Sequence, residues 1–168
     1  MSILTQKTIS KRISLAGIGI HTGLKVQLNI LPAQPNTGII FKRIDIKKNN
    51  IIIPTYNNVV DATLCTTIAN DHGSRVSTIE HLMGAFYGLG IDNAIIELNS
   101  QEVPIMDGSA KKFVELILET GIQASEVPIK IIKVEKQIEI KEGDKSISIN
   151  KSNVSLDIDF EIKYQNQF

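Results

Sequence analysis

Residues 77–98, with the sequence STIEHLMGAFYGLGIDNAIIEL, predict a helix that is followed by a strand. The helix is expected from about Ser77 to Tyr87, because apolar side chains recur there at the spacing of one helix face. This apolar stripe consists of Ile79, Leu82, Met83, Phe86 and Tyr87. The short apolar run at 94–98 predicts a strand. Together the two elements indicate helices packed on a sheet.

His81 lies nearly opposite the middle of this apolar stripe on the predicted helix. The residues around it are Gly84, Ala85 and Gly88, rather than the Lys and Glu that are typical of a solvated helix face. We therefore expect a second domain, a ligand or a metal site to approach this face closely.

The segment before this helix is predicted to form mainly strands. Strands are expected over 25–30, 38–43 and 64–69. In the first of them apolar and polar residues alternate, which is the period-two pattern of a half-buried strand. Gly17 and Gly19 are expected to interrupt the preceding segment, and 21–23 is expected to be a loop.

A second helix is predicted from about Ser109 to Thr120, with Gly121 as its C-terminal cap. Strands and helices that follow each other without strict alternation indicate an α+β fold. We expect residues 1–126 to form a two-layer sandwich, in which a mostly antiparallel sheet carries helices on one face.

Residues 127–168 are expected to begin a second, similar domain after a linker at 125–128. The pattern there predicts a three-stranded antiparallel sheet, with a turn at Gly143 and Asp144. One face of that sheet would carry Ile132, Val134, Ile138, Ile140, Ile147, Ile149, Val154, Leu156, Ile158, Phe160 and Ile162. Because no covering helix follows, this sheet would pack on the first domain or on another chain, or the chain has been cut short. We favour the cut.

The composition excludes several classes of protein. The 168-residue chain has 18 basic and 18 acidic residues, which argues against a uniformly basic nucleic-acid-binding protein. Residues 1–60 are basic and 61–126 acidic, so the basic part could attract a nucleotide diphosphate unless folding mixes the two signs. No apolar run approaches the roughly 20 residues of a membrane helix. The single Cys65 cannot form an internal disulfide, and a cytoplasmic location is expected.

Glu80 and His81 are the strongest candidates for chemistry. A carboxylate beside an imidazole suits metal-assisted hydrolysis, with His as ligand and Glu as general base. A structural alternative is also open, because Ser77 as N-cap would place Glu80 where it completes a capping box. The other histidines are His21 and His72, so this chain by itself is not expected to complete a zinc site, which normally has three protein ligands.

Three further features have structural and functional interpretations. Asp107 or Ser109 could cap the second helix, which the local sequence favours over catalysis. Cys65 is most simply a buried strand residue, with a cysteine–histidine nucleophile as the minor alternative. The glycines at 17–23 do not form the Gly-x-Gly-x-x-Gly pattern of dinucleotide sites.

Four segments in order resemble the N-terminal half of the UDP-3-O-acyl-N-acetylglucosamine deacetylase family. Members of this family are zinc enzymes that commit Gram-negative bacteria to lipid A synthesis. The segments are GIGIHTG at 17–23, STIEHLM at 77–83, GLGIDN at 88–93 and VPIMDGSA at 103–110. The resemblance covers the chain from about Lys7 to its end. It implies two α+β sandwich domains with the active site between them.

The resemblance also implies roles for individual residues. It implies that His81 binds Zn²⁺ and that Glu80 is the catalytic general base. The substrate cleft would be bordered by His21, Leu64 and Cys65, with Asp107 in support. The remaining zinc ligands, a general-acid histidine and a threonine that polarises the carbonyl are implied to lie in the second domain, outside this chain.

The implied reaction is hydrolysis of the N-acetyl group of UDP-3-O-acyl-N-acetylglucosamine with release of acetate, in the cytoplasm of a Gram-negative bacterium. We expect the chain by itself to be inactive, because it would need the missing C-terminal half of the enzyme. Two alternatives are open. One is a non-catalytic binding or interaction module, or an enzyme remnant, that pairs through its exposed sheet. The other is a hydrolase that depends on Cys65.

Overall fold

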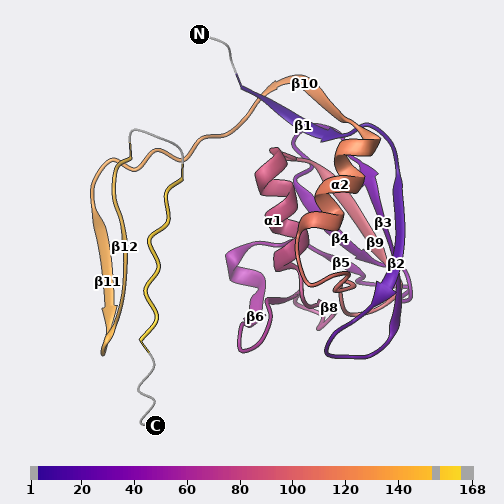
Figure 1. Ribbon diagram of the computed structural model, residues 1–168, viewed down its shortest axis with the longest axis horizontal. Coiled ribbons are helices and arrows are strands. Elements are labelled where there is room, and N and C mark those ends of the chain that lie inside the picture. The colour runs from indigo at the N-terminus through magenta and orange to yellow at the C-terminus, as the bar shows by residue number, and fades with distance from the viewer. Residues whose placement is uncertain (1–3, 153–155, 164–168) are drawn as a thin grey trace. The chain divides into compact units, whose positions relative to one another are not determined.

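The computed structural model describes residues 4–152 and 156–163 (Figure 1). The chain divides into two compact units, Met1–Ile129 and Lys130–Phe168, called unit 1 and unit 2 below. All the candidate site residues belong to unit 1.

A five-stranded mixed sheet forms the centre of the described part of unit 1, with strand order β2-β3-β9-β4-β5. Its strands are β2 (Ile13–Ile18), β3 (Lys25–Pro32), β9 (Ala94–Leu98), β4 (Ile39–Arg43) and β5 (Ile51–Ile52). Neighbouring strands are antiparallel, except that β4 and β9 run parallel. The alternation that predicts a strand at 25–30 is confirmed, because Val26, Leu28 and Ile30 are all buried in β3.

The helices of unit 1 pack against one face of this sheet, as Figure 1 shows. Within the described residues they are α1 (Glu80–Leu89) and α2 (Lys111–Thr120). Gly121 ends α2 with a φ of 91°, which confirms its predicted role as the C-terminal cap. The predicted α+β sandwich is therefore confirmed for unit 1. In the ranges that the structure describes, no helix is long and apolar enough to cross a membrane.

The core lies between the sheet and the two helices. The largest of its fully buried side chains are Phe41, Phe86, Phe113, Ile9, Leu28, Ile30, Ile52, Ile68, Leu82, Ile96, Leu98 and Ile117. Each such side chain contributes about 1.5–3 kcal/mol through removal from water. Burial of this core fixes the position of α1, whose first turn carries the candidate catalytic pair.

The apolar stripe of α1 differs from the prediction at two positions. Tyr87 is 67% exposed, whereas Ala85 is almost completely buried. Leu82, Ala85 and Phe86 follow the i, i+3, i+4 spacing of a single buried stripe, and Tyr87 lies about 100° further round the helix. Ala85 therefore packs in the core and does not line the exposed face near His81.

The remaining strands of unit 1 form two smaller sheets in the described part. One pairs β1 (Thr5–Ile9) with β10 (Ile122–Pro128), and the other contains β6 (Val59–Asp61), β7 (Thr67–Ala69) and β8 (Arg75–Val76) after a 3-10 turn, η1 (Tyr56–Asn58). The prediction of a linker at 125–128 is wrong. These residues end β10, where Pro128 lies opposite Thr5, so pairing with the N-terminal strand overrides the local Ser-Glu-Val-Pro signal.

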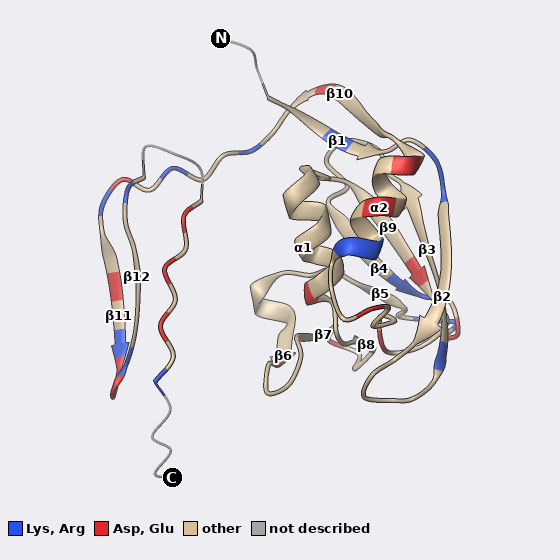
Figure 2. Cartoon of the chain, in the orientation of Figure 1, with Lys and Arg blue, Asp and Glu red and all other residues tan. Residues whose placement is uncertain are grey.

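Basic and acidic segments of the sequence are mixed by folding, as Figure 2 shows for unit 1. Lys42 on β4 and Glu97 on the neighbouring β9 form an ion pair of 2.9 Å. Arg43, which is mostly buried, pairs with Asp45 of the same basic segment at 2.6 Å and reaches the acidic segment only through the Arg75 carbonyl, at 2.9 Å. At Lys42 a positive charge of the basic segment is therefore neutralised by an acidic residue of the following segment.

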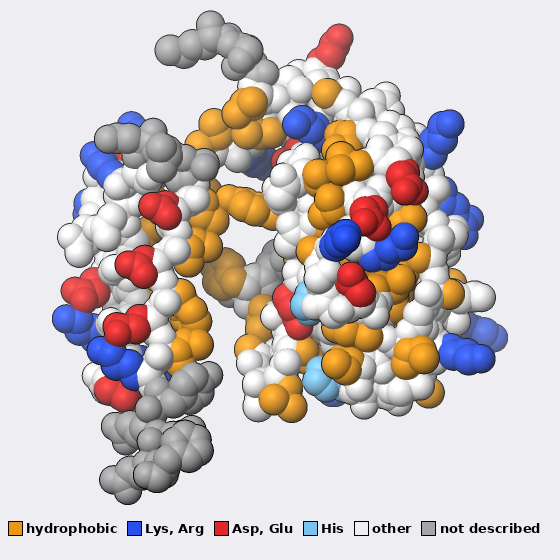
Figure 3. All heavy atoms as spheres, viewed as in Figure 1, with side chains coloured by type: hydrophobic (Ala, Val, Ile, Leu, Met, Phe, Trp, Pro, Cys, Tyr) orange, Lys and Arg blue, Asp and Glu red, His pale blue; other side chains and the backbone are white. Residues whose placement is uncertain are grey.

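The described part of unit 2 contains one antiparallel hairpin, formed by β11 (Ile138–Glu142) and β12 (Lys145–Ile149). Its apolar side chains are exposed, and Figure 3 shows hydrophobic side chains gathered along one side. The expected third strand is absent from the described range 156–163, where no neighbouring backbone completes a ladder. Val154 lies outside the described residues. That residues 127–168 begin a second domain stays a prediction.

Candidate active site

Glu80 and His81 form the first turn of α1. One oxygen of the Glu80 carboxylate, Oε2, accepts a hydrogen bond from the Thr66 N–H at 3.0 Å. Thr66 immediately precedes β7, so this bond joins the start of the helix to the small three-stranded sheet. Both side chains of the pair are half-buried and remain accessible to water.

The capping-box alternative for Glu80 is wrong. The helix begins at Glu80, its N-cap position is Ile79, and no side-chain cap bond is found there in the described part of the chain. The Ser77 hydroxyl instead donates to the Gln101 carbonyl at 3.2 Å. Glu80 therefore has no local capping role, although a carboxylate in the first turn still interacts favourably with the helix dipole.

Thr78 bends the chain into α1 in a strained conformation. It is buried and has a φ of 58°, which is unusual for a β-branched residue. Its hydroxyl donates to Oε1 of Glu102 at 3.1 Å. This bond holds the bend two residues before Glu80.

Glu102 is a completely buried carboxylate that none of the motif patterns indicates. Within the described residues it accepts four hydrogen bonds: from the His21 N–H at 3.0 Å, the Thr22 N–H at 2.9 Å, the Thr22 hydroxyl at 2.7 Å and the Thr78 hydroxyl. Burial raises the pKa of this carboxyl, but the hydrogen bonds from His21, Thr22 and Thr78 hold the pKa below its ordinary value of 4.5. Its sequence context does not mark it, because an acidic residue directly before a valine also occurs at Glu126.

Close packing against residues 102–106 explains the glycines of the 17–23 motif. A Cβ at Gly17 would lie 2.8 Å from Pro104 Cβ and 3.1 Å from the Met106 sulfur. A Cβ at Gly19 would collide with the Glu102 carboxylate and the Thr22 hydroxyl. The prediction that Gly17 interrupts its segment is wrong, because β2 continues through it and the missing side chain serves close approach.

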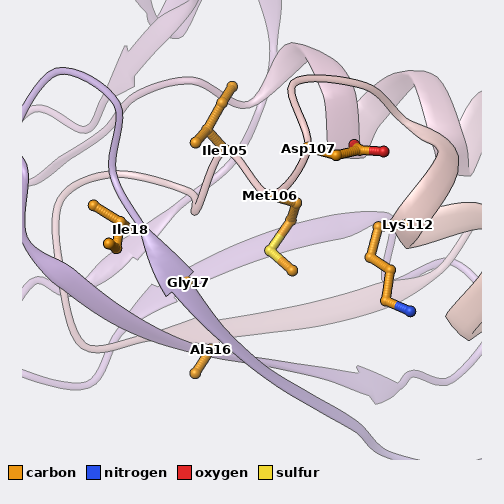
Figure 4. A pocket seen from close by; sticks show the side chains of 7 residues that line it. All are labelled: Ala16, Gly17, Ile18, Ile105, Met106, Asp107 and Lys112. Atoms are coloured by element: carbon orange, nitrogen blue, oxygen red, sulfur yellow. The ribbon is translucent and has the colours of Figure 1, made fainter.

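An open groove runs beside this packing contact. It is lined by Ala16, Gly17, Ile18, Ile105, Met106, Asp107 and Lys112 (Figure 4). The Ile105 N–H donates to the Ile18 carbonyl at 3.0 Å, which joins the two segments that border the groove. The groove is apolar on the side of β2, with Asp107 and Lys112 on the side of α2.

Asp107 organises the turn that leads into α2. Its carboxylate accepts bonds from the Ser109 hydroxyl at 2.9 Å and the Ser109 N–H at 3.0 Å, and these bonds lower its pKa. The Ser109 hydroxyl in turn accepts from the Lys111 N–H at 3.1 Å. The prediction that Asp107 caps α2 is wrong, because the N-cap position is Ala110 without a side-chain cap bond and the hydrogen bonds of Asp107 stay within the turn before the helix.

Leu64 and Cys65 lie in the bend before β7, next to Thr66. Leu64 is 82% exposed, and Cys65 is only half-buried, so the prediction of a buried strand cysteine is wrong. The strand begins two residues later, because the chain bends at 63–65. The Cys65 sulfur lies 3.8 Å from the Thr67 hydroxyl, and this contact is with an alcohol and not with the imidazole that a nucleophile would need.

The donor set provides only part of a metal site. Among the residues that the structure describes, no three His, Cys, Asp or Glu side chains are grouped so that they could hold a metal ion. His81 would supply a single ligand, and His72 lies in an exposed turn. Zinc would therefore need further ligands from outside these residues.

Two sets of contacts bring the candidate residues together. The first joins Glu80 to Thr66, the neighbour of Cys65. The second joins the backbone of His21 through Glu102 to Thr78, close to the start of α1. An α+β sandwich that presents a carboxylate beside an imidazole at the start of a helix has a candidate hydrolytic site.

Comparison with known proteins identifies the family. The profile of the family LpxC, UDP-3-O-acyl N-acetylglycosamine deacetylase, matches residues 6–168. Curated relatives named UDP-3-O-acyl-N-acetylglucosamine deacetylase include those of Haemophilus ducreyi (43% identical, 96% of this chain, 53% of the relative), Teredinibacter turnerae (46%, 95% and 53%) and Histophilus somni (46%, 85% and 47%). This chain belongs to the UDP-3-O-acyl N-acetylglycosamine deacetylase family, and it spans about half the length of these relatives.

Proposed function

We propose that this chain forms one side of the active site of a zinc-dependent deacetylase. The enzyme would hydrolyse the N-acetyl group of UDP-3-O-acyl-N-acetylglucosamine and release acetate in lipid A synthesis. The names of the relatives support the substrate. The observation that carries the proposal is the Glu80 carboxylate, which lies beside His81 and is not used to cap its own helix.

Glu80 would act as the general base. The Thr66 N–H holds Oε2, while Oε1 accepts no hydrogen bond within the described residues and can face a water molecule. A half-buried carboxylate in this arrangement can take a proton from the attacking water while its orientation is kept.

His81 would bind zinc through its imidazole. Zinc, when bound, would lower the pKa of a bound water molecule and polarise the carbonyl group of the amide. Because no three His, Cys, Asp or Glu side chains of the described residues are grouped to hold a metal ion, the other ligands and the general acid would come from the part of the relatives' length that this chain does not span. We therefore propose that the 168-residue chain is inactive by itself.

The substrate would lie between Glu80 and the neighbouring bends. Leu64 and Cys65 adjoin Thr66, so they are placed to border a substrate that reaches the Glu80 carboxylate. His21 is exposed in the loop held by Glu102, and Asp107 would support the cleft through the turn before α2. We propose a cytoplasmic location in a Gram-negative bacterium, in keeping with the free thiol of Cys65.

The test uses this chain joined to the second half that its relatives possess. Glu80→Gln should retain zinc and lower kcat by about 10²–10⁴-fold, because the general base is lost. His81→Ala should lose tightly bound zinc, and His72→Ala, in the exposed turn, is the matched control that should retain both zinc and activity. Full activity of Glu80→Gln, or unchanged zinc binding by His81→Ala, would contradict the proposal. Deacetylation by the purified 168-residue chain would contradict its inactivity.

A further inference from the structure

We propose that Glu102 is a positioning residue, which locks the loop at 19–24 against the turn into α1 and thereby sets the position of the Glu80 carboxylate. The loop at 19–24 is called the His21 loop below. The catalytic consequence of this lock rests on the proposed function, but the lock itself is a property of the fold. The Glu102 carboxylate is a buried charged group that takes no part in the proposed hydrolysis, and the positioning role explains its presence.

Both oxygens of Glu102 are fully used. Oε1 accepts from the His21 N–H and the Thr78 hydroxyl, and Oε2 accepts from the N–H and the hydroxyl of Thr22. No Lys or Arg pairs with this carboxylate in the described part of the chain. Its negative charge is therefore stabilised by oriented N–H and O–H groups from two segments that lie far apart in the sequence.

The backbone around Glu102 holds the same turn. The Ser77 N–H donates to the Gln101 carbonyl at 2.9 Å, and the Val103 N–H donates to the Ser77 carbonyl at 3.0 Å. The Thr78 hydroxyl adds the bond that keeps this residue in its left-handed conformation. Because Glu80 lies two residues after Thr78, the orientation of the Glu80 carboxylate depends on these hydrogen bonds.

Only a carboxylate satisfies all four donors. A glutamine would have to turn its NH₂ group toward one pair of donors, and each pair contains a backbone N–H that cannot rotate away. One buried N–H, of His21 or of Thr22, would then lose its acceptor. The space around the Glu102 carboxylate is also tight, because a Cβ at Gly19 would collide with it.

The Thr66 amide is a natural reporter of the Glu80 position. It donates to Glu80 and is not among the hydrogen-bond donors to Glu102 in the described residues, so we expect it to respond to Glu102 only if the turn into α1 moves. A residue that merely stabilised the fold would change the exchange of amides that open by global unfolding, such as that of Leu28, and would not change the Thr66 amide selectively.

The experiment measures amide hydrogen exchange by NMR in the 168-residue chain. Glu102→Gln should speed exchange at His21, Thr22 and Thr66 by about tenfold or more relative to the Leu28 amide of β3. If Glu102→Gln does not fold, two milder substitutions at Thr22 test the same interaction. Thr22→Val removes one donor and should speed exchange at the His21 and Thr66 amides, whereas Thr22→Ser keeps the hydroxyl and should match the unmodified chain.

A control variant distinguishes the local effect of Glu102 on the turn from a general loss of stability. Asn93→Ala removes a buried amide that accepts from the Gly38 N–H and donates to Gln6, away from the site. It should not speed exchange at His21, Thr22 or Thr66 relative to the Leu28 amide. The proposal is overturned if Glu102→Gln does the same, if the Thr66 amide does not respond, or if Thr22→Ser behaves like Thr22→Val.

The catalytic consequence is measured separately. In the chain joined to its second half, Glu102→Gln should lower kcat by about tenfold or more while KM changes less, since the base is misplaced and not removed. If the exchange results hold and the joined protein does not deacetylate the UDP-sugar, the proposed function fails and the lock stands. If kcat is unchanged in an active protein, the positioning role is overturned.

Discussion

Unit 1 and unit 2 carry the same alternation of apolar and polar residues, but within the described residues only unit 1 buries the apolar side chains. Leu28 and Ile30 on β3 are completely buried, whereas Ile140 and Ile147 on the hairpin of unit 2 are 64% and 70% exposed. The difference lies in α1 and α2, which cover the sheet of unit 1. Alternation thus favours a strand but is not sufficient for one, since residues 156–163 alternate without forming a strand, and burial requires a second layer of chain.

The largest expected effect tests this difference with two phenylalanines. Phe41→Ala in unit 1 should lower the free energy of unfolding by about 3–5 kcal/mol, because the side chain is completely buried. Phe160→Ala in unit 2, where the side chain is 79% exposed, should change it by less than about 0.5 kcal/mol. Urea denaturation measures both. Equal losses would mean that unit 2 has a packed core.

The next effect comes from the buried charge of unit 1. Glu102→Gln should lower the free energy of unfolding at neutral pH by about 1–3 kcal/mol. Since the folded pKa of Glu102 lies below 4.5, its contribution is present above that value and is lost as the pH falls through the folded pKa. The difference between the two proteins should therefore narrow from neutral pH to about pH 3, as followed by denaturation at each pH.

An exposed carboxylate provides the control for this pH series. Glu119→Gln on α2 should change the free energy of unfolding by less than about 0.5 kcal/mol at neutral pH. A difference between Glu102→Gln and the unmodified chain that grows in acid would contradict the lowered pKa of Glu102.

A smaller effect, which stabilises the fold, is expected from a substitution in α1. At Gly84, no heavy atom of the described residues beyond its own helix turns lies within 4 Å of an added Cβ, and the position is exposed. Gly84→Ala should therefore stabilise unit 1 by about 0.5–1 kcal/mol, through the higher helix propensity of alanine. Gly19→Ala, which collides with Glu102, should destabilise it. Thermal denaturation of the two variants should give melting temperatures on opposite sides of the unmodified chain.

The smallest effect on stability is expected from removal of unit 2. A chain of residues 1–129 should keep the melting temperature of unit 1 within a few degrees, because the core residues all lie in that range. It should also bind less of a hydrophobic fluorescent dye, since the exposed isoleucines of the hairpin are gone. A large loss of stability would show that unit 2 supports the fold of unit 1.

Local periodicity was sufficient to predict much of the fold. The strands at 25–30 and 94–98 and the helix that ends at Gly121 are confirmed, because their side chains repeat with the period of a single element. The errors arise where pairing with a segment far away in the sequence determines the secondary structure. Residues 125–128 become a strand because the N-terminal strand pairs with them.

The site was predictable only in part. Glu80 and His81 stand out from their neighbours, but the predicted helix start at Ser77 is wrong, because α1 begins at Glu80 after the left-handed Thr78, and the proposed roles rest on the family resemblance. Glu102 could not be predicted, because its partners His21, Thr22 and Thr78 are brought to it by tertiary structure. The conformation of Thr78 likewise depends on that distant carboxylate and on no local signal.

The bonds from His21 and Thr22 to Glu102 also set an order of events during synthesis. They join residues that are 81 and 80 positions apart in the sequence. At about 5–20 residues per second, the ribosome adds Glu102 roughly 4–16 s after the loop has been made. The His21 loop is therefore encoded near the start of unit 1 but reaches its final shape late, after most of the sheet has been translated.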